Sequence, residues 1–345
     1  MNVIVIMLDS LRQDFVNAYN KTDCPLKTPN LDKFANEAVL FNNCYPEGLP
    51  TIPVRTDLMT GMSTLTNRPW QPLVPTDVTA SQILRKEGYL TALIADTYHI
   101  FKPDMNFHKN FDIFQWIRGA EYDGVHVGPL KSLKFEDFVN ENIPTEWHGY
   151  TMAALRNLDG KTEPEEFPCW KTMNSALSFL EEARQEKRPK FLWIDTFQTH
   201  EPWYPPVKFD TFGDPDYKGP KIILPPGGPA AKWGDEEVQK RTCSLYTGEV
   251  AYTDFCVGKL FDGMRRLGYF DDSVIVVLSD HGHPLGDHGK FLKGSDRLYS
   301  ELLKVPFMIR FPKSNYCGKH LNNLSRFSDM LPTLLDIVGL KSNTK

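Results

Sequence analysis

The sequence lacks long hydrophobic runs, and neither sign of charge is in large excess. None of its 345 residues falls in a run near 18 consecutive apolar residues, which excludes a membrane-spanning helix. Lys and Arg number 39 against 44 Asp and Glu, and no basic block stands out, so nucleic acid is not expected as a partner. With 41% hydrophobic residues and no internal repeat, the composition is typical of a soluble globular protein with a large core.

Cysteine pairs with metal or redox spacing are also missing. The six cysteines have no CxxC spacing: Cys24, Cys44, Cys169, Cys243, Cys256 and Cys317. This excludes a zinc ribbon and argues against a disulfide framework, so we expect free thiols in a reducing compartment. The first residues, Met1 to Asp9, have no basic segment before a short apolar run, which favours a buried strand over a signal peptide. We therefore predict a cytoplasmic protein.

Short apolar runs alternate with longer amphipathic stretches. The runs predict strands at Val3–Leu8, Tyr89–Ala95, Phe191–Ile194, Val274–Leu278 and Pro306–Phe311. The amphipathic stretches predict helices at Asn30–Ala38, Val78–Glu87, Lys171–Gln185, Asp235–Arg266 and Ser328–Val338. This alternation predicts an α/β layered fold in a single domain, with a mostly parallel central sheet and helices on both faces.

Two stretches do not fit this alternation. Residues 104–168 are less regular than the rest and rich in aromatic residues and Asn. Residues 204–234 are crowded with Pro and Gly, which predicts a long surface loop. Such a loop is either a lid or binding loop or a mere insertion.

Three of the predicted strands end in aspartate, at Asp9, Asp195 and Asp280. The carboxyl ends of parallel strands lie along one edge of a sheet, where ligands bind. Three carboxylates gathered there would repel one another, and a divalent metal ion would relieve the repulsion. The alternative is that each aspartate caps the following helix.

The segment after the third aspartate favours the metal. Residues 280–289 hold three histidines and two aspartates laced with glycine, beginning Asp280-His281. Glycine lets the backbone turn tightly, while carboxylate and imidazole supply mixed oxygen and nitrogen ligands. A polar loop with incidental histidines is the alternative.

Residues 48–61 predict a short helix from Ile52 to Thr60. Thr51 stands at the expected N-cap, Pro53 in the first turn and Gly61 at the end. The amino end of a helix attracts anions, and a threonine hydroxyl near a metal could act as a nucleophile. From the local sequence alone, capping is the stronger interpretation of Thr51, and Arg55 could reach a nucleophile or an anion.

Together these segments resemble the sulfatase family of the alkaline phosphatase superfamily over nearly the whole chain. The matching segments, in the family's order, are residues 2–14, Thr28–Ala35, Phe41–Tyr45, the helix from Thr51, Gly88–Ala92, Thr199–Pro202, Ser279–Gly289, Lys293-Gly294, Val305–Phe307 and Leu331–Leu335. The resemblance implies an alkaline-phosphatase-like fold. It also implies that residues 1–345 form one catalytic domain in which the usual C-terminal subdomain is absent or truncated.

The resemblance further implies a set of site residues. Asp9, Asp280 and His281 would hold one divalent metal ion, with the nucleophile Thr51 as a further ligand. Arg55 would stabilise the nucleophile and the transferred group. His200 and Lys293 would contact the bound oxyanion and assist the leaving oxygen, as in-line displacement at phosphorus or sulfur requires.

The chain departs from the family in three ways. Thr51 replaces the Cys or Ser that becomes formylglycine in sulfatases, as in superfamily members that act on phosphodiesters. Ser10 replaces an aspartate, which favours Mn²⁺ or Zn²⁺ over an all-oxygen Ca²⁺ site, although Ca²⁺ is not excluded. The lysine that contacts sulfate is absent; Tyr98 or His99 could replace it, and Asn106 and His108 could face the substrate.

We therefore predict a hydrolase of small-molecule phosphodiesters or phosphonate monoesters that acts through a covalent intermediate on Thr51. Three alternatives stay open: a sulfuric ester hydrolase without formylglycine, a phospho-group transferase, and a catalytically silent metal- or anion-binding relative. A single metal is favoured over two, for which Asp195, His200, His283, His288 and His320 are the candidate extra ligands. No membrane partner is expected, and a homo-oligomer is compatible with the sequence.

Overall fold

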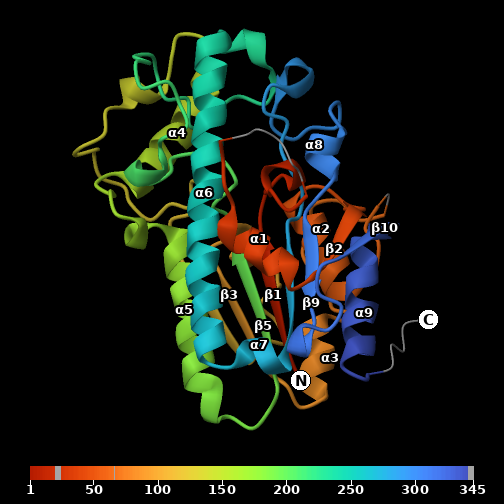
Figure 1. Cartoon of the computed structure of the whole chain (residues 1–345). Helices are drawn as coiled ribbons and strands as arrows, with labels where there is room; N and C mark the ends of the chain where they lie inside the picture. Colours follow the sequence, from red (N-terminus) through yellow and green to blue (C-terminus); the bar gives the residue numbers. More distant parts are fainter. Residues whose placement is uncertain (20–24, 66, 341–345) are drawn as a thin grey trace.

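A computed structural model describes residues 1–19, 25–65 and 67–340 and places one large sheet at its centre (Figure 1). The sheet has eight strands in the order β10-β2-β9-β7-β1-β5-β3-β4. In that order their bounds are Lys319–Arg326, Val39–Tyr45, Phe307–Arg310, Ser273–Leu278, Asn2–Leu8, Lys190–Thr196, Leu90–Ala95 and Ile113–Trp116. Only β9 runs antiparallel to its neighbours, so the prediction of a mostly parallel sheet is confirmed.

Alternate residues of β1 enter two separate hydrophobic cores. Ile4, Ile6 and Leu8 pack into the core that includes helices α1 (Pro29–Asn36), α5 (Pro168–Glu182) and α6 (Glu236–Arg266). Val3, Val5 and Met7 pack into the core that includes α2 (Thr51–Thr60), α3 (Ala80–Lys86) and α9 (Met330–Ile337). Because successive side chains of a strand point to opposite faces, this confirms helices on both sides of the sheet (Figure 1).

The predicted elements are present, with ends shifted by a few residues. All five predicted strands correspond to β1, β3, β5, β7 and β9, and the predicted helices correspond to α1, α3, α5, α6, α9 and α2. The remaining helices are α4 (Thr145–Leu158), α7 (Tyr269–Asp272) and α8 (Ser300–Leu303), and a small second sheet pairs β6 (Gly228–Pro229) with β8 (Lys290–Phe291).

The structure adds detail to the two less regular stretches. Residues 104–168 contain strand β4 and the fourteen-residue helix α4. Residues 204–234 hold only short turns and β6, but they are not confined to the surface, because Ile222, Ile223 and Trp233 are buried. Apolar side chains within the loop anchor it to the core beneath α6.

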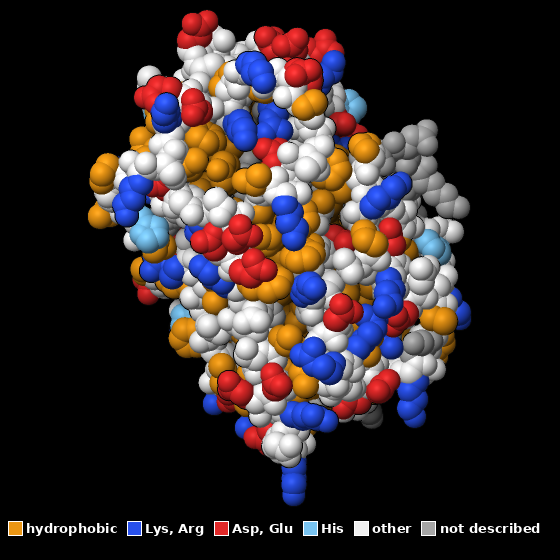
Figure 2. All heavy atoms as spheres, turned by 60° about the vertical axis from the view of Figure 1, so that its left-hand side comes forward, with side chains coloured by type: hydrophobic (Ala, Val, Ile, Leu, Met, Phe, Trp, Pro, Cys, Tyr) orange, Lys and Arg blue, Asp and Glu red, His pale blue; other side chains and the backbone are white. Residues whose placement is uncertain are grey.

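The surface and the cysteines fit the composition. Lys, Arg, Asp and Glu side chains are interspersed on the face in Figure 2, with hydrophobic side chains in several patches between them. The five described cysteines are free thiols, and Cys24 lies outside the described residues. Within the described ranges, no helix has both the length and the apolar character needed to cross a bilayer.

Candidate active site

Three carboxylates meet where the central parallel strands end. Asp9 directly follows β1, and Asp195 is the last residue but one of β5. Asp280 lies two residues after the end of β7. Since β1 pairs with both β5 and β7, the three ends are adjacent, and none of the three carboxylates is exposed to solvent. The predicted convergence at the carboxyl edge is confirmed.

The guanidinium of Arg55 lies among these carboxylates. Its Nε and Nη2 donate to the two oxygens of Asp195 at 2.8 and 2.6 Å. Nη2 also donates to Asp9 at 2.9 Å, while Nη1 donates to Asp280 at 2.9 Å and to the Thr51 carbonyl at 3.1 Å. A guanidinium has five N–H donors, and all five point at protein acceptors.

This arrangement changes two expectations. Arg55, rather than a metal ion, is the cation that neutralises Asp195. The expected contact between Arg55 and a transferred group does not fit this geometry, because no N–H of its guanidinium remains for a ligand. Arg55 instead fixes the first turn of α2 against the three strand ends.

Asp9, Asp280 and His281 form a cluster that suits a metal ion. One ligand atom from each lies within 4.8 Å of the others, and all three residues are buried. His281 Nδ1 lies 2.9 Å from the Gly282 carbonyl, to which it can only donate, so Nε2 carries the free lone pair. Nε2 has no hydrogen-bond partner in the structure. An orphaned buried nitrogen beside two carboxylates is the donor set expected for Mn²⁺ or Zn²⁺.

The electrostatics of the cluster suit a bound cation. Burial, followed by the neighbouring charge of Asp280, raises the pKa of Asp9 well above its ordinary value. Burial lowers the pKa of His281 to about 4, which leaves the imidazole in the neutral form that binds metals. A divalent ion would stabilise both the ionised Asp9 and the neutral His281.

The candidates for a second metal do not assemble around Asp195. Both Asp195 oxygens accept from Arg55, and they also accept from Thr97 at 2.6 Å and from Trp193 at 3.3 Å. His288 stacks on Tyr299, and His320 is exposed on β10 next to Asn42. Among the described residues, the cluster of Asp9, Asp280 and His281 is the one that gathers such ligands.

Thr51 begins helix α2 rather than capping it. The N-cap is Pro50, whose carbonyl accepts from Val54 at 3.3 Å, and no side chain makes a capping bond. The predicted capping role of Thr51 was therefore wrong by one position, because the hydrogen-bonded turn starts at Pro50. Thr51 is 1% exposed and its hydroxyl is not engaged in a cap.

His200 and Lys293 contact each other as a pair. Lys293 Nζ lies 2.7 Å from His200 Nε2, and His200 Nδ1 lies 2.6 Å from the Glu201 carbonyl. Because a carbonyl only accepts, Nδ1 carries the proton and Nε2 accepts from the ammonium. Burial lowers the pKa of His200 to about 4, so Lys293 supplies the proton of this pair at neutral pH.

Of the predicted substrate-binding residues, the structure brings two close to this pair. The His99 ring lies beside Phe197, which stacks on His200, and Tyr98 packs on His99. Asn106 donates to the Leu73 carbonyl, and His108 packs on Phe101 and Phe114. Those contacts place Asn106 against the loop at Leu73 and His108 among aromatic residues near β4, and neither contact is with the carboxylates.

Sequence reasoning missed two buried ionisable residues of the site, Glu201 and Glu121, and it named a third, His283, only as a candidate ligand for a second metal. Glu201 Oε1 lies 3.4 Å from Lys293 Nζ, and Glu201 Oε2 lies 3.1 Å from His283 Nε2. Glu121 Oε2 lies 3.0 Å from His99 Nε2. Glu201 and His283 stand inside the two motifs that were identified, whereas Glu121 lies in the less regular stretch and carried no signal.

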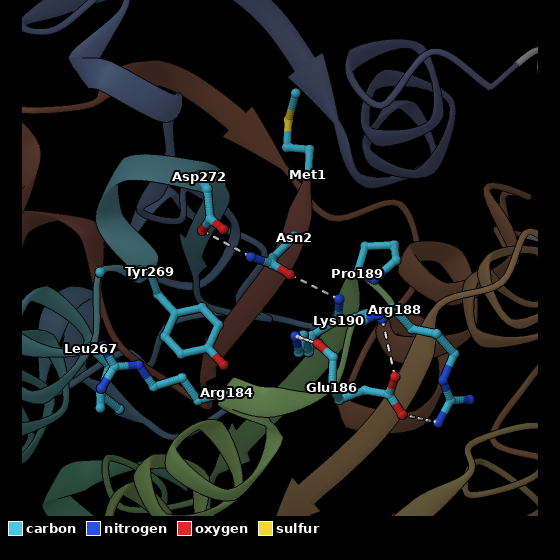
Figure 3. Close-up of a pocket in the computed structure, with 12 residues that line it drawn as sticks. Met1, Asn2, Arg184, Glu186, Arg188, Pro189, Lys190, Leu267, Tyr269 and Asp272 are labelled. Carbon is cyan, nitrogen blue, oxygen red and sulfur yellow. Dashed lines mark hydrogen bonds and ion pairs between the residues drawn. The ribbon is translucent and has the colours of Figure 1, made fainter.

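One cavity lies away from the carboxyl edge and is a weaker candidate for the site. A cavity of about 410 Å³ lies where β1 and β5 begin, at the opposite edge of the sheet (Figure 3). Its polar groups partner one another: Asn2 donates to Asp272 at 2.8 Å and accepts from the Lys190 amide at 2.9 Å, and Arg188 pairs with Glu186. It lacks the buried, unpartnered groups that mark the carboxyl edge.

Comparison with known proteins agrees with the fold. The family model described as Sulfatase matches residues 1–340. The multifunctional alkaline phosphatase superfamily protein PehA of Trinickia caryophylli is 26% identical over 98% of this chain and 74% of its own length. An arylsulfatase of Clostridium perfringens is 25% identical over 98% and 75%. The crystal structure of a phosphonate monoester hydrolase of Agrobacterium radiobacter matches with a TM-score of 0.73 at 20% identity, over 98% of this chain and 74% of that one.

Proposed function

The chain belongs to the sulfatase family, a family of ester-bond hydrolases in the alkaline phosphatase superfamily, and we propose that it hydrolyses phosphodiesters or phosphonate monoesters through Thr51. The substrate would be a small-molecule ester. The observation that carries the proposal is the position of Thr51, at the first residue of α2, one turn before the arginine that joins Asp9, Asp195 and Asp280.

The identity of residue 51 favours phosphorus over sulfur. Oxidation of a threonine would give a ketone rather than the aldehyde of formylglycine, so the usual sulfatase nucleophile cannot form here. A hydroxyl at the amino end of a helix lies beside free backbone N–H groups and the positive end of the helix dipole. Such a site binds the non-bridging oxygens of an anionic ester.

A divalent metal fits Asp9, Asp280 and His281, and when bound it would lower the pKa of a nearby hydroxyl and neutralise developing negative charge. The Thr51 oxygen bonds to phosphorus while the bond from phosphorus to the leaving oxygen breaks. Arg55 holds the backbone of Thr51 in place through its bond to the Thr51 carbonyl. Water then breaks the bond between phosphorus and the Thr51 oxygen and restores the hydroxyl.

The leaving oxygen needs a proton, and Lys293 with His200 is placed to give it. The ammonium of Lys293 is the donor in this pair, and the imidazole fixes its direction. Glu201 lies close to both groups, with Oε1 3.4 Å from Lys293 Nζ and Oε2 3.3 Å from His200 Nδ1. The pair therefore serves as general acid in the first step.

The test is a comparison of initial rates on four p-nitrophenyl esters with Mn²⁺- or Zn²⁺-loaded protein: a phosphodiester, a phosphonate monoester, a phosphate monoester and a sulfate ester. We expect the diester or the phosphonate to have the highest kcat/KM. A preference for the sulfate ester would overturn the proposal and favour a sulfuric ester hydrolase with another nucleophile. Transfer to an added alcohol in place of water would indicate a transferase, and bound metal without turnover would indicate a silent relative.

A further inference from the structure

Buried polar atoms without hydrogen-bond partners gather around His200. In the described part of the chain they include Tyr98 Oη, His99 Nδ1, Glu121 Oε2, Glu201 Oε2 and both ring nitrogens of His283. The rings of His99 and His200 both pack on Phe197, and the His283 ring lies 5.9 Å from that of His200. Buried polar groups are normally satisfied, so this concentration marks a place where a ligand completes the bonding.

Glu121 is the most informative of these residues. Its side chain is only 2% exposed, and Oε2 lies 3.0 Å from His99 Nε2 without the alignment of a hydrogen bond. Burial opposes ionisation, yet His200 and His99 nearby lower the pKa of Glu121 overall. Glu121 is thus a buried, ionised carboxylate, and its Oε2 has no aligned hydrogen-bond donor.

A small cavity connects Glu121 with His200. Its volume is about 30 Å³, and both residues line it together with Phe197. Asp96 and Glu249 also line it, but burial raises their pKa values to about 7 and about 8, so Glu121 is the main source of negative charge there. No Lys or Arg lines the cavity. A space of this size holds one water-sized group, such as a hydroxyl or a primary ammonium, but not a trimethylammonium group.

From this geometry we propose that Glu121 and the adjoining cavity bind a primary ammonium group on the leaving alcohol of the substrate. The inference rests on the proposed function, since His200 belongs to the pair that meets the leaving oxygen there. An ammonium group supplies three donors and one positive charge, which matches a buried carboxylate in a cavity that no Lys or Arg lines. The substrate class would be esters of short amino alcohols.

The experiment compares three methyl phosphodiesters. They differ only in the second alcohol, the leaving group, which is 2-aminoethyl, propyl or 2-(trimethylammonio)ethyl. Metal-loaded wild-type protein should prefer the 2-aminoethyl ester to the propyl ester by roughly tenfold in kcat/KM, and the trimethylammonium ester should gain nothing over propyl. In Glu121→Gln the ratio of 2-aminoethyl to propyl should fall toward one. Glu181→Gln, a matched change on the exposed side of α5, should keep the wild-type ratio.

If wild-type protein has the same kcat/KM on the 2-aminoethyl and propyl esters, the inference is overturned and the proposed function stays intact. Equal preference for the primary and the quaternary ammonium would overturn the role of the small cavity. If no ester turns over, the proposed function fails. The Kd values of the three esters, measured by titration calorimetry, would then still decide the inference. The wild-type ratios do not depend on whether Glu121→Gln folds.

Discussion

Thr51 begins α2 with a hydroxyl that is not used in helix capping, while Arg55 holds its carbonyl from one turn further on. Replacing Thr51 by Ala removes the nucleophile and leaves these backbone bonds in place. We expect Thr51→Ala to lose at least about a thousandfold in kcat on the preferred ester, because removal of a nucleophile leaves only binding and electrostatic effects. Initial rates on purified, metal-loaded protein measure the loss.

Thr51→Ser is the matched control for this prediction. Serine keeps the oxygen and should retain measurable turnover, and it should show the same ester preference as the wild type. The melting temperatures of both variants should stay close to that of the wild type, since Thr51 makes no capping bond. Wild-type turnover in Thr51→Ala would contradict the assignment of the nucleophile.

Asp195 has a structural role that the sequence did not reveal. Both of its oxygens accept hydrogen bonds from Arg55, and neither residue is exposed. Asp195→Asn leaves the buried guanidinium without its closest counter-charge, so we expect a loss of about 3–5 kcal/mol in the free energy of unfolding. Asp296→Asn removes a half-exposed carboxylate that pairs with Arg297 and Lys290, and it should cost far less stability because solvent screens such pairs. Urea denaturation measures both, and equal losses would contradict the prediction.

Helix α6 carries a pH-dependent element of stability at Glu249. Its carboxylate accepts from the Tyr204 amide at 2.6 Å and from Gln198 at 2.7 Å, and it joins α6 to the segment that follows β5. Burial raises the pKa of Glu249 to about 8 from 4.5, so the folded state retains a proton that the unfolded state loses. Between about pH 5 and 8 this residue should lower the free energy of unfolding by about 1.4 kcal/mol per unit of rising pH.

Glu249→Gln removes that titration. Urea denaturation at pH 5, 6, 7 and 8 should give a shallower decline for the variant than for the wild type. Glu181→Gln, exposed on α5, should reproduce the wild-type slope. Parallel declines in Glu249→Gln and the wild type would refute the raised pKa.

The contact between α1 and α6 depends on a glycine. A Cβ at Gly258 would lie 2.3 Å from the Asn30 side chain, which donates to Asp254 at 2.8 Å. We expect Gly258→Ala to destabilise the protein by about 1–3 kcal/mol, because α1 would have to move away. Gly149→Ala in α4, where nothing lies within 4 Å, should be neutral or stabilising by up to about 1 kcal/mol. Thermal unfolding of the two variants would separate them, and equal melting temperatures would contradict the close packing.

The sequence predicted those elements whose residues have one strong periodicity. The apolar runs of β1 and β7 and the long amphipathic pattern of α6 were visible because both faces, or one wide face, are buried. Strand β10 was not visible, because nearly all of its side chains are exposed at the edge of the sheet. Strand β4 is also mostly exposed and has only 4 residues, so its sequence shows no clear hydrophobic pattern.

The candidate site could be predicted only where strand topology brings motifs together. Aspartates at the ends of three parallel strands had to converge, and they did. The bonding of Arg55 could not be predicted, since it depends on which oxygens face α2. Glu121 could not be predicted either, because it reaches His99 from a segment without a recognisable pattern.

At the scale of the whole molecule, a metal bound between β1 and β7 should stabilise the fold. The cluster of Asp9, Asp280 and His281 joins residues from opposite ends of the chain, so it exists only in the folded chain. A ligand of the folded state at 100 times its Kd adds about 2.7 kcal/mol to the free energy of unfolding. We expect Mn²⁺ or Zn²⁺ to raise the melting temperature of EDTA-treated protein more than Ca²⁺ does, because His281 supplies a nitrogen ligand.

His281→Ala tests whether the metal acts through this cluster. In this variant, Mn²⁺ or Zn²⁺ should raise the melting temperature much less than in the wild type. His288→Ala, a change at a half-exposed histidine of the same segment, should keep the wild-type rise. Equal shifts in the two variants would place the metal elsewhere. Since the melting temperature is read without substrate, a shift confined to protein with His281 would locate the ion even if every ester tested were turned over slowly.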